Sequence, residues 1–380
     1  MLKSSLFVLL FLLIGGIGQA RVWTDSLGRK FEGTLIRKDG DSVVLDIGGR
    51  QRTLAFSQLS PADQAYLKGG RSRRSSAKES VPSVQASKAQ IQANTGIQVV
   101  RLSADTVNKR WSYGSPNFEF ICDDDLGLPV VREFAWMFES VWQFAARKPF
   151  DLPRLRAQQK VRMKTYLIKS YADYVKMGGP PKSGGVFISS RDIILIPYQS
   201  LGITNHGGRY RVDSKVGNYT LRHEVAHQLM LGQSQQAGWF IEGSAEYIAT
   251  VPYQQTRMLV SHHQKSVIDY LTAYGWNGQG GRNLGRNLKL ARLESLMNPD
   301  YATFQKQPNA YASALLLYYY FMKFDGKRDG AALAAYVGEL QYGRPEFVAR
   351  EKLLAGRSYA ELEKQMAAAW NQVGIRLTFE

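Results

Sequence analysis

The stretch TLRHEVAHQLM, residues 220–230, constrains this chain more than any other part of its sequence. It places His223 and His227 four positions apart, with Glu224 directly after the first histidine. With only 5 histidines in 380 residues, chance produces such a pattern on the order of 0.003 times per chain. Helical residues four apart lie on one face, so both imidazoles can share one metal ion. The stretch predicts a helix that presents two metal ligands; an ordinary helix with a polar stripe is the alternative.

A second helix-like stretch, GWFIEGSAEYIAT at 238–250, supplies carboxylates. A catalytic zinc ion takes three protein ligands and leaves a fourth position for water, and Glu242 completes a His-His-Glu set if the two helices pack together. Glu246, one turn later, can accept the ring N–H of a ligating histidine. Glu224 is placed to take a proton from a metal-bound water. A solvated face is the alternative for the two later glutamates, but their apolar neighbours make unpaired carboxylates costly.

Other histidines compete weakly for the third ligand position. His206 and the pair His262–His263 lie in no motif with ligand spacing. The longer metzincin pattern requires glycine and histidine where this chain has Met230 and Gln233, so that class is excluded.

The first 20 residues predict export. MLKSSLFVLLFLLIGGIGQA has one lysine, an apolar run from Leu6 to Ile17, and small residues before Ala20. The run is shorter than the roughly 20 residues that span a bilayer. We expect cleavage after Ala20, a location that is secreted, periplasmic or in the cell envelope, and no membrane span in the mature chain. An uncleaved signal anchor is the alternative.

Charge and cysteine content narrow the partners and the chemistry. The formal net charge of +17 favours anionic partners. Export argues against nucleic acid, which leaves phospholipid headgroups or an acidic envelope polymer; a solvated basic surface without such a partner is the alternative.

Cys122 is the single cysteine, so no intramolecular disulfide can form. A buried small hydrophobe is a better interpretation of Cys122 than a nucleophile.

Composition divides the mature chain into three parts. Residues 21–68 hold strand-like runs at 31–37, 42–47 and 52–56, separated by tight-turn residues and followed by a short helix that Pro61 begins, as in a small SH3-like β-barrel. Residues 69–95 are rich in Ser, Ala, Gln, Lys and Arg, which predicts a disordered basic linker.

Residues 96–380 form the third part. Strand-like runs at 117–122, 161–169, 185–190 and 192–198, with helical patterns between them, precede a mostly helical remainder. This order indicates an α+β fold. The run at 192–198, just before the site helix, is a candidate edge strand along which an extended peptide could pair.

The N-terminal part resembles the SLA-type homology domain, an SH3-like module of exported proteins in planctomycete and verrucomicrobial lineages. RVWTD, GRKFEGTL and VVLDIGGRQRTLAFSQLSPADQAYL carry the resemblance. It implies a binding or scaffolding module without catalysis. The resemblance does not specify a ligand; we expect a protein or an anionic envelope polymer.

The third part resembles the peptidase MA-like gluzincins. LRHEVAHQLM followed by GWFIEGSAEYIA matches their HExxH and WxxEGxAEY motifs. The resemblance implies a zincin-like fold, zinc ligands His223, His227 and Glu242, the base Glu224, and a secreted metalloendopeptidase with a peptide or protein substrate. Only 14 residues separate His227 from Glu242, fewer than in thermolysin-like or aminopeptidase N-like enzymes, which disfavours an exopeptidase.

Related enzymes stabilise the oxyanion with a tyrosine or a second histidine. Tyr311, which follows the site helices, is the candidate here; a core aromatic residue is the alternative.

Two other functions stay open: a cell-envelope binding or scaffold protein with little turnover, and an amidase acting on cell-wall peptides. The presence of Glu224 favours catalysis, because a domain used only for binding has no need of a base.

Overall fold

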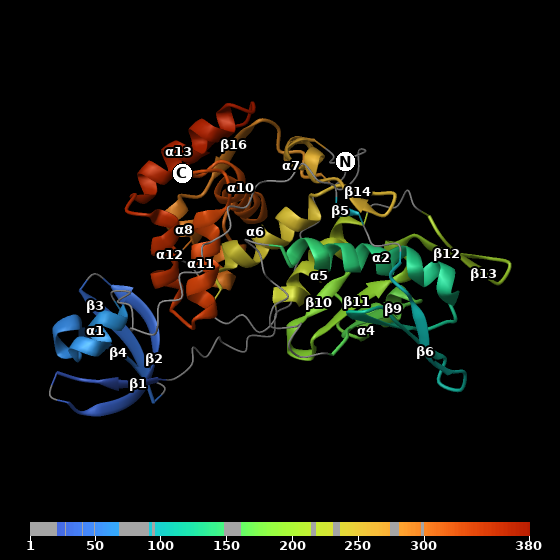
Figure 1. Cartoon of the computed structure of the whole chain (residues 1–380), viewed down its shortest axis with the longest axis horizontal. Helices are drawn as coiled ribbons and strands as arrows, with labels where there is room; N and C mark the ends of the chain where they lie inside the picture. The colour runs from blue at the N-terminus through green and yellow to red at the C-terminus, as the bar shows by residue number, and fades with distance from the viewer. Residues whose placement is uncertain are drawn as a thin grey trace.

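The structure is a computed structural model that describes residues 21–26, 28–39, 41–48, 50–67, 91–92, 96–147, 161–213, 218–230, 236–273, 281–297 and 300–380 (Figure 1). The predicted signal peptide, residues 1–20, lies outside the described residues, as do residues 69–90 and 93–95 of the predicted linker. Among the described helices, none combines the length and apolar character needed to traverse a bilayer.

The N-terminal part is a four-stranded antiparallel sheet in chain order. It consists of β1 (Arg21–Thr24), β2 (Lys30–Asp39), β3 (Ser42–Ile47) and β4 (Arg50–Ala55), followed by η1 (Phe56–Gln58) and α1 (Pro61–Leu67). The buried carboxylate of Asp63 accepts hydrogen bonds from the Thr24 N–H and the Ser60 hydroxyl, which ties α1 to β1. The predicted strands and helix are confirmed. Within the described residues β1 and β4 do not pair, so this sheet is open rather than a closed barrel.

A six-stranded mixed sheet positions the first half of the larger part. Its order is β10-β11-β9-β8-β7-β6, formed by β6 (Val100–Asp105), β7 (Arg110–Gly114), β8 (Phe118–Cys122), β9 (Met163–Ile168), β10 (Val186–Ile188) and β11 (Ile193–Pro197). Strands β8, β9 and β11 run parallel, and β10 pairs antiparallel with β11. The candidate edge strand at 192–198 was therefore misplaced: β11 lies inside the sheet, and β10 is the edge.

Helices cover both faces of this sheet. Helix α2 (Gly127–Ala145) packs on β8 and α5 (Tyr219–Met230) packs on β10 and β11, while α4 (Tyr171–Lys176) packs on β9 and β11 over a separate apolar cluster. Ser170 caps α4 by accepting the Asp173 N–H, the contact for which serine is favoured before a helix.

The remainder is mostly helical, which confirms the α+β class. Its helices are α6 (Gly238–Ala249), α7 (His263–Thr272), α8 (Leu293–Met297), α9 (Tyr301–Gln305), α10 (Ala310–Lys323), α11 (Ala331–Gln341), α12 (Glu346–Leu354) and α13 (Tyr359–Asn371). Small sheets join β12 (Ile203–His206) with β13 (Arg209–Val212), β16 (Asn287–Leu290) with β17 (Arg376–Phe379), and β14 (Tyr253–Gln254) with β15 (Arg257–Met258) and β5 (Ile91–Gln92). Strand β5 falls within the predicted linker, and its residues 91–92 pair antiparallel with β15.

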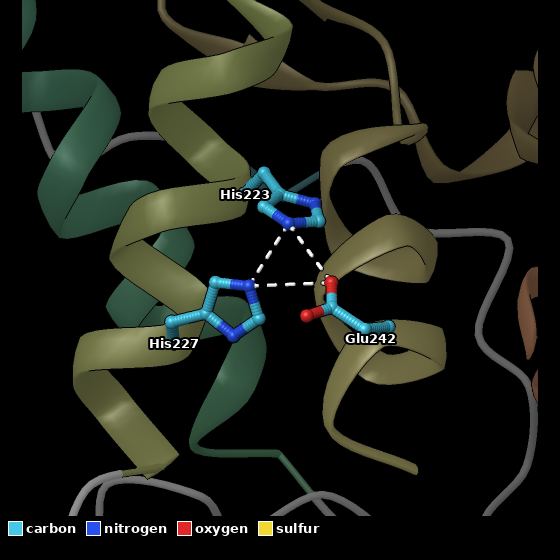
Figure 2. Close-up of side chains that lie close together, drawn as sticks. All are labelled: His223, His227 and Glu242. Carbon is cyan, nitrogen blue, oxygen red and sulfur yellow. Dashed lines mark hydrogen bonds and ion pairs between the residues drawn. The ribbon is translucent and has the colours of Figure 1, made fainter. Parts of the chain in front are cut away.

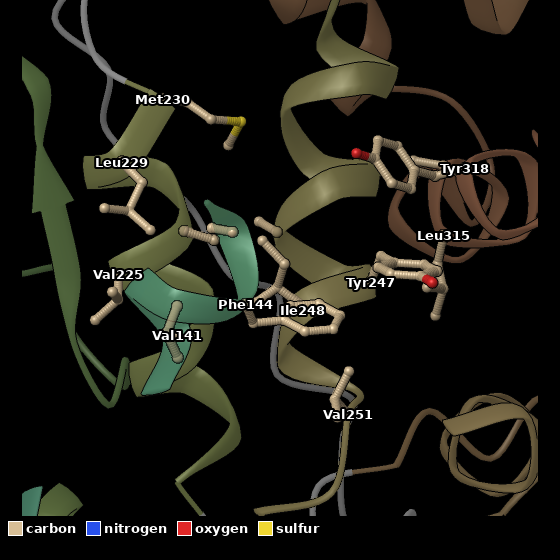
Figure 3. Packing of buried hydrophobic residues seen from close by; sticks show 14 of the residues in the cluster. Val141, Phe144, Val225, Leu229, Met230, Tyr247, Ile248, Val251, Leu315 and Tyr318 are labelled. Atoms are coloured by element: carbon tan, nitrogen blue, oxygen red, sulfur yellow. The ribbon is translucent and has the colours of Figure 1, made fainter. Parts of the chain in front are cut away.

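The core runs continuously from α2 through α5 and α6 to α10 (Figure 3). Val141 and Phe144 of α2 face α5 and α6, and Tyr318 of α10 closes the other side of α6. Gly243 makes the α6–α10 contact close: a Cβ there would lie 2.7 Å from the Ala314 carbonyl oxygen. A buried helix pair at this separation holds α6 in one place relative to its neighbours.

Cys122 is buried at the end of β8. Burial raises the pKa of its thiol, which suppresses the reactive thiolate. We expect no reaction of the native protein with an aromatic disulfide reagent at pH 8, and one reacting thiol per chain after denaturation, measured by the absorbance of the released thiolate. Rapid labelling of the native protein would contradict the interpretation of Cys122 as a core residue.

Candidate metal centre

Two neighbouring helices bring the three predicted ligands together (Figure 2). His223 and His227 project from α5, and Glu242 projects from α6; all three side chains are buried. The two Nε2 atoms lie 2.9 Å apart. Glu242 Oε2 lies 3.3 Å from Nε2 of His223 and 3.5 Å from Nε2 of His227.

This triangle of atoms fits a tetrahedral metal ion. Zn–N and Zn–O bonds of about 2.0–2.1 Å place neighbouring ligand atoms roughly 3.3 Å apart in a tetrahedron. The three separations here, 2.9, 3.3 and 3.5 Å, lie around that value. Glu242 Oε2 is buried and has no hydrogen-bond partner among the described residues. A buried carboxylate oxygen that faces two imidazole nitrogens is the donor arrangement that a cation completes.

Contacts at both ends hold α5 and α6 antiparallel. Arg222, next to His223, is buried and donates to the Ala249 carbonyl oxygen at 2.6 Å, at the C-terminus of α6. At the C-terminal end of α5, Met230 Sδ accepts from the hydroxyl of Ser244, in the middle of α6, at 2.9 Å. A cation at a helix C-terminus is favourable because the last carbonyls there are unsatisfied. An antiparallel pair needs only a short connection, which accounts for the 14 residues between His227 and Glu242.

The charges of the three ligands are coupled. Burial by itself lowers the pKa of His223, but the nearby carboxylates, Glu242 above all and then Glu246 and Glu224, outweigh it and raise the pKa to about 9. For Glu242, burial acts to raise the pKa, and the charges of His227 and His223 outweigh it and lower the pKa. The carboxylate therefore stays ionised and prefers a positive neighbour, either a proton on His223 or a metal ion that displaces that proton.

Glu224 lies beside this ligand set without belonging to it. Its Oε2 accepts the backbone N–H of Phe187 at 2.8 Å, so the edge strand β10 holds the carboxylate in place. Burial raises the pKa of Glu224, although both histidines oppose this. A carboxylate with a raised pKa is a better proton acceptor, as a general base requires.

Glu246 lies next to His223, but not in the predicted hydrogen bond. Its Oε1 is 3.9 Å from His223 Nδ1, beyond hydrogen-bonding distance, and Nδ1 has no hydrogen-bond partner within the described part of the chain. Instead Glu246 accepts from the Tyr219 hydroxyl and forms an ion pair with Arg282 at 2.7 Å. The Glu246 carboxylate is therefore held by Tyr219 and Arg282 rather than by the ring.

Tyr311 of α10 lies near the ligand set but contacts a neighbouring tyrosine. Its hydroxyl interacts with the hydroxyl of Tyr301 and accepts from Gln305 Nε2 at 3.5 Å. Tyr301, in α9, is the phenol that donates to Glu242 Oε1. Tyr301, rather than the predicted Tyr311, therefore contacts a ligand directly, and Tyr311 reaches the site through Tyr301.

Sequence reasoning missed Tyr301 and Arg282. Tyr301 comes 59 positions after Glu242, and Arg282 comes 36 positions after Glu246. Neither lies in a motif with ligand spacing. Only the packing of α9 and of the segment before β16 brings them to α6, so no local signal could have found them.

The competing histidines stay away from the site. Exposed His206 lies on β12 and exposed His262 lies just before α7. His263 is buried, and its Nε2 lies 3.1 Å from the Thr250 hydroxyl. Among the described residues, the one group of ligand side chains close enough to hold a metal ion is His223, His227 and Glu242.

Comparisons with protein-family models, with curated proteins and with solved structures find no match to this chain. The chemistry of the site therefore has to be inferred from its own residues. Those residues are three convergent buried ligands, a separate buried carboxylate, and two phenols beside them.

Proposed function

We propose that this chain is an exported zinc metalloendopeptidase of the peptidase MA-like gluzincin kind, with a zincin-like larger part and an SH3-like N-terminal module. One observation carries the proposal: Glu224 is buried beside the ligand set and held by Phe187, while the three ligands converge without it. A structural metal site has no need of a further buried carboxylate beside its ligands. A hydrolytic site needs one as its base.

Each residue has a role in peptide hydrolysis. His223, His227 and Glu242 would hold zinc, which when bound polarises the scissile carbonyl and lowers the pKa of a water molecule. Glu224 is placed to accept a proton from the attacking water and to pass it to the leaving amine. The charge that develops on the attacked carbonyl oxygen needs a donor, and Tyr311, whose hydroxyl interacts with that of Tyr301, is the candidate.

Two further features support the proposal. The open four-stranded sheet with α1 is consistent with an SH3-like module that binds a protein or an anionic envelope polymer. The edge strand β10 lies against α5 and reaches Glu224, so a substrate along it would pass the base.

Native mass spectrometry of the mature protein tests the metal site. We expect one zinc ion per chain, lost in His223→Ala and kept in His206→Ala, which replaces an exposed histidine outside the site. Wild-type protein without metal, or equal zinc loss in both variants, would rule out the proposed site.

A peptide library tests the reaction. We expect internal cleavage of peptides, detected by mass spectrometry, and its loss on treatment with a chelator. The library should include cell-wall peptides, because cleavage confined to these would assign an amidase. A zinc-loaded protein that cleaves no peptide would favour a binding or scaffold role.

A further inference from the structure

The two oxygens of Glu242 have different neighbours. Oε2 faces the Nε2 atoms of His223 and His227 at 3.3 and 3.5 Å. Oε1 accepts a hydrogen bond from the Tyr301 hydroxyl. The Glu242 side chain has no exposed surface, so the phenol rather than bulk water satisfies Oε1. The carboxylate therefore has one oxygen directed at the ligand set and one held by α9.

We propose that Tyr301 is a positioning residue that makes Glu242 a ligand through one oxygen only. A carboxylate can bind a metal ion through one oxygen or both, and a second oxygen would occupy the position that water needs. Hydrogen bonds to the non-ligating atoms of metal ligands fix their orientation and commonly change metal affinity by about 10- to 100-fold. The inference depends on the metal site of the proposed function, but not on its substrate.

The placement of Tyr301 is built into the packing of α9 on α6. Asp300 caps α9 by accepting the Thr303 N–H at 2.9 Å. Phe304, one turn after Tyr301, is buried against Gly238 at the start of α6, where a Cβ would lie only 2.8 Å from the Phe304 ring. The missing side chain lets α9 approach closely enough for the phenol to reach Glu242.

The surroundings of Tyr301 favour a phenol that donates. An ionised carboxylate can only accept a hydrogen bond, so the Tyr301 hydroxyl is the donor to Glu242 Oε1. The hydroxyl of Tyr311 also interacts with the Tyr301 hydroxyl. The phenol thus lies between the acceptor Glu242 and the hydroxyl of Tyr311.

The test is zinc affinity of the full chain carrying Tyr301→Phe, measured by competition with a chromophoric chelator. We expect zinc to bind about 10- to 100-fold more weakly than in wild type. Tyr342→Phe, which removes a phenol from an exposed residue, should leave the affinity unchanged. Equal melting temperatures of the metal-free wild type and Tyr301→Phe would establish that the variant is folded.

Cobalt substitution provides a second readout that does not depend on activity. Four-coordinate cobalt absorbs visible light more strongly than five-coordinate cobalt. If Glu242 becomes free to bind through both oxygens in Tyr301→Phe, the visible band weakens. An unchanged spectrum together with unchanged zinc affinity would overturn the proposal.

The outcomes separate this inference from the proposed function. Wild type without metal refutes the metal site itself. Wild type and Tyr301→Phe with equal zinc affinity and equal cobalt spectra refute only the role of Tyr301. A fall in kcat with unchanged affinity and spectrum also overturns it, because Tyr301 would then act on the substrate rather than on Glu242.

Discussion

Glu224→Gln is expected to lower the rate of peptide hydrolysis by about 10²- to 10⁴-fold while zinc stays bound. The amide has no proton affinity comparable to that of a carboxylate, so it cannot accept the proton of the attacking water. Its carbonyl oxygen can still accept the Phe187 N–H, which Glu224 Oε2 accepts at 2.8 Å. The variant therefore removes the base and keeps the packing of α5 against β10.

The measurement is kcat on a cleaved library peptide, with zinc content determined on the same samples. Glu351→Gln, at an exposed position of α12, is the matched control and should behave as wild type. Activity equal to wild type in Glu224→Gln would remove Glu224 from the role of base. Loss of zinc in that variant would show that Glu224 supports the ligands instead.

Gly243→Ala is expected to lower the free energy of unfolding by about 1–3 kcal/mol, the usual cost of overpacking. The new Cβ would lie 2.7 Å from the Ala314 carbonyl oxygen and 3.1 Å from Tyr318 Cβ. The first of these is backbone of a buried helix and cannot turn aside. Helix α6 must then move away from α10, and it carries Glu242 with it, so zinc affinity should fall as well.

Urea denaturation of the metal-free proteins measures this effect. Gly338→Ala is the control, since it lies inside α11 with nothing within 4 Å of the added Cβ. There the substitution should stabilise the protein by about 0.5–1 kcal/mol, because alanine is the better helix former. Equal stability of the two variants would contradict the close approach of α6 and α10.

The sequence is informative where the structure depends on neighbours along the chain. His223 and His227 share a face because of helical periodicity, and Glu242 joins them because α6 follows α5 through a short connection. The strands of the N-terminal part follow from β-branched runs between turn residues, and α4 begins where Ser170 can cap it.

Contacts between distant segments could not be predicted in this way. The position of a strand within a sheet depends on every other strand. The run at 192–198 therefore gave no sign that β10 would pair with its outer side and become the edge of the sheet. Tyr301 and Arg282 reach Glu242 and Glu246 only through tertiary packing. Tyr219 and Arg282 also explain why Glu246 does not hydrogen-bond to His223, a competition that no spacing rule contains.

The antiparallel pairing of α5 and α6 has a consequence for folding. All three ligands lie within the 20 residues from His223 to Glu242, so bringing them together closes only a short loop, at a small cost in chain entropy. An unfolded chain can then gather the same ligands transiently and bind zinc weakly. Since binding to the unfolded chain offsets binding to the native one, zinc should raise the melting temperature by less than its affinity for the native protein implies.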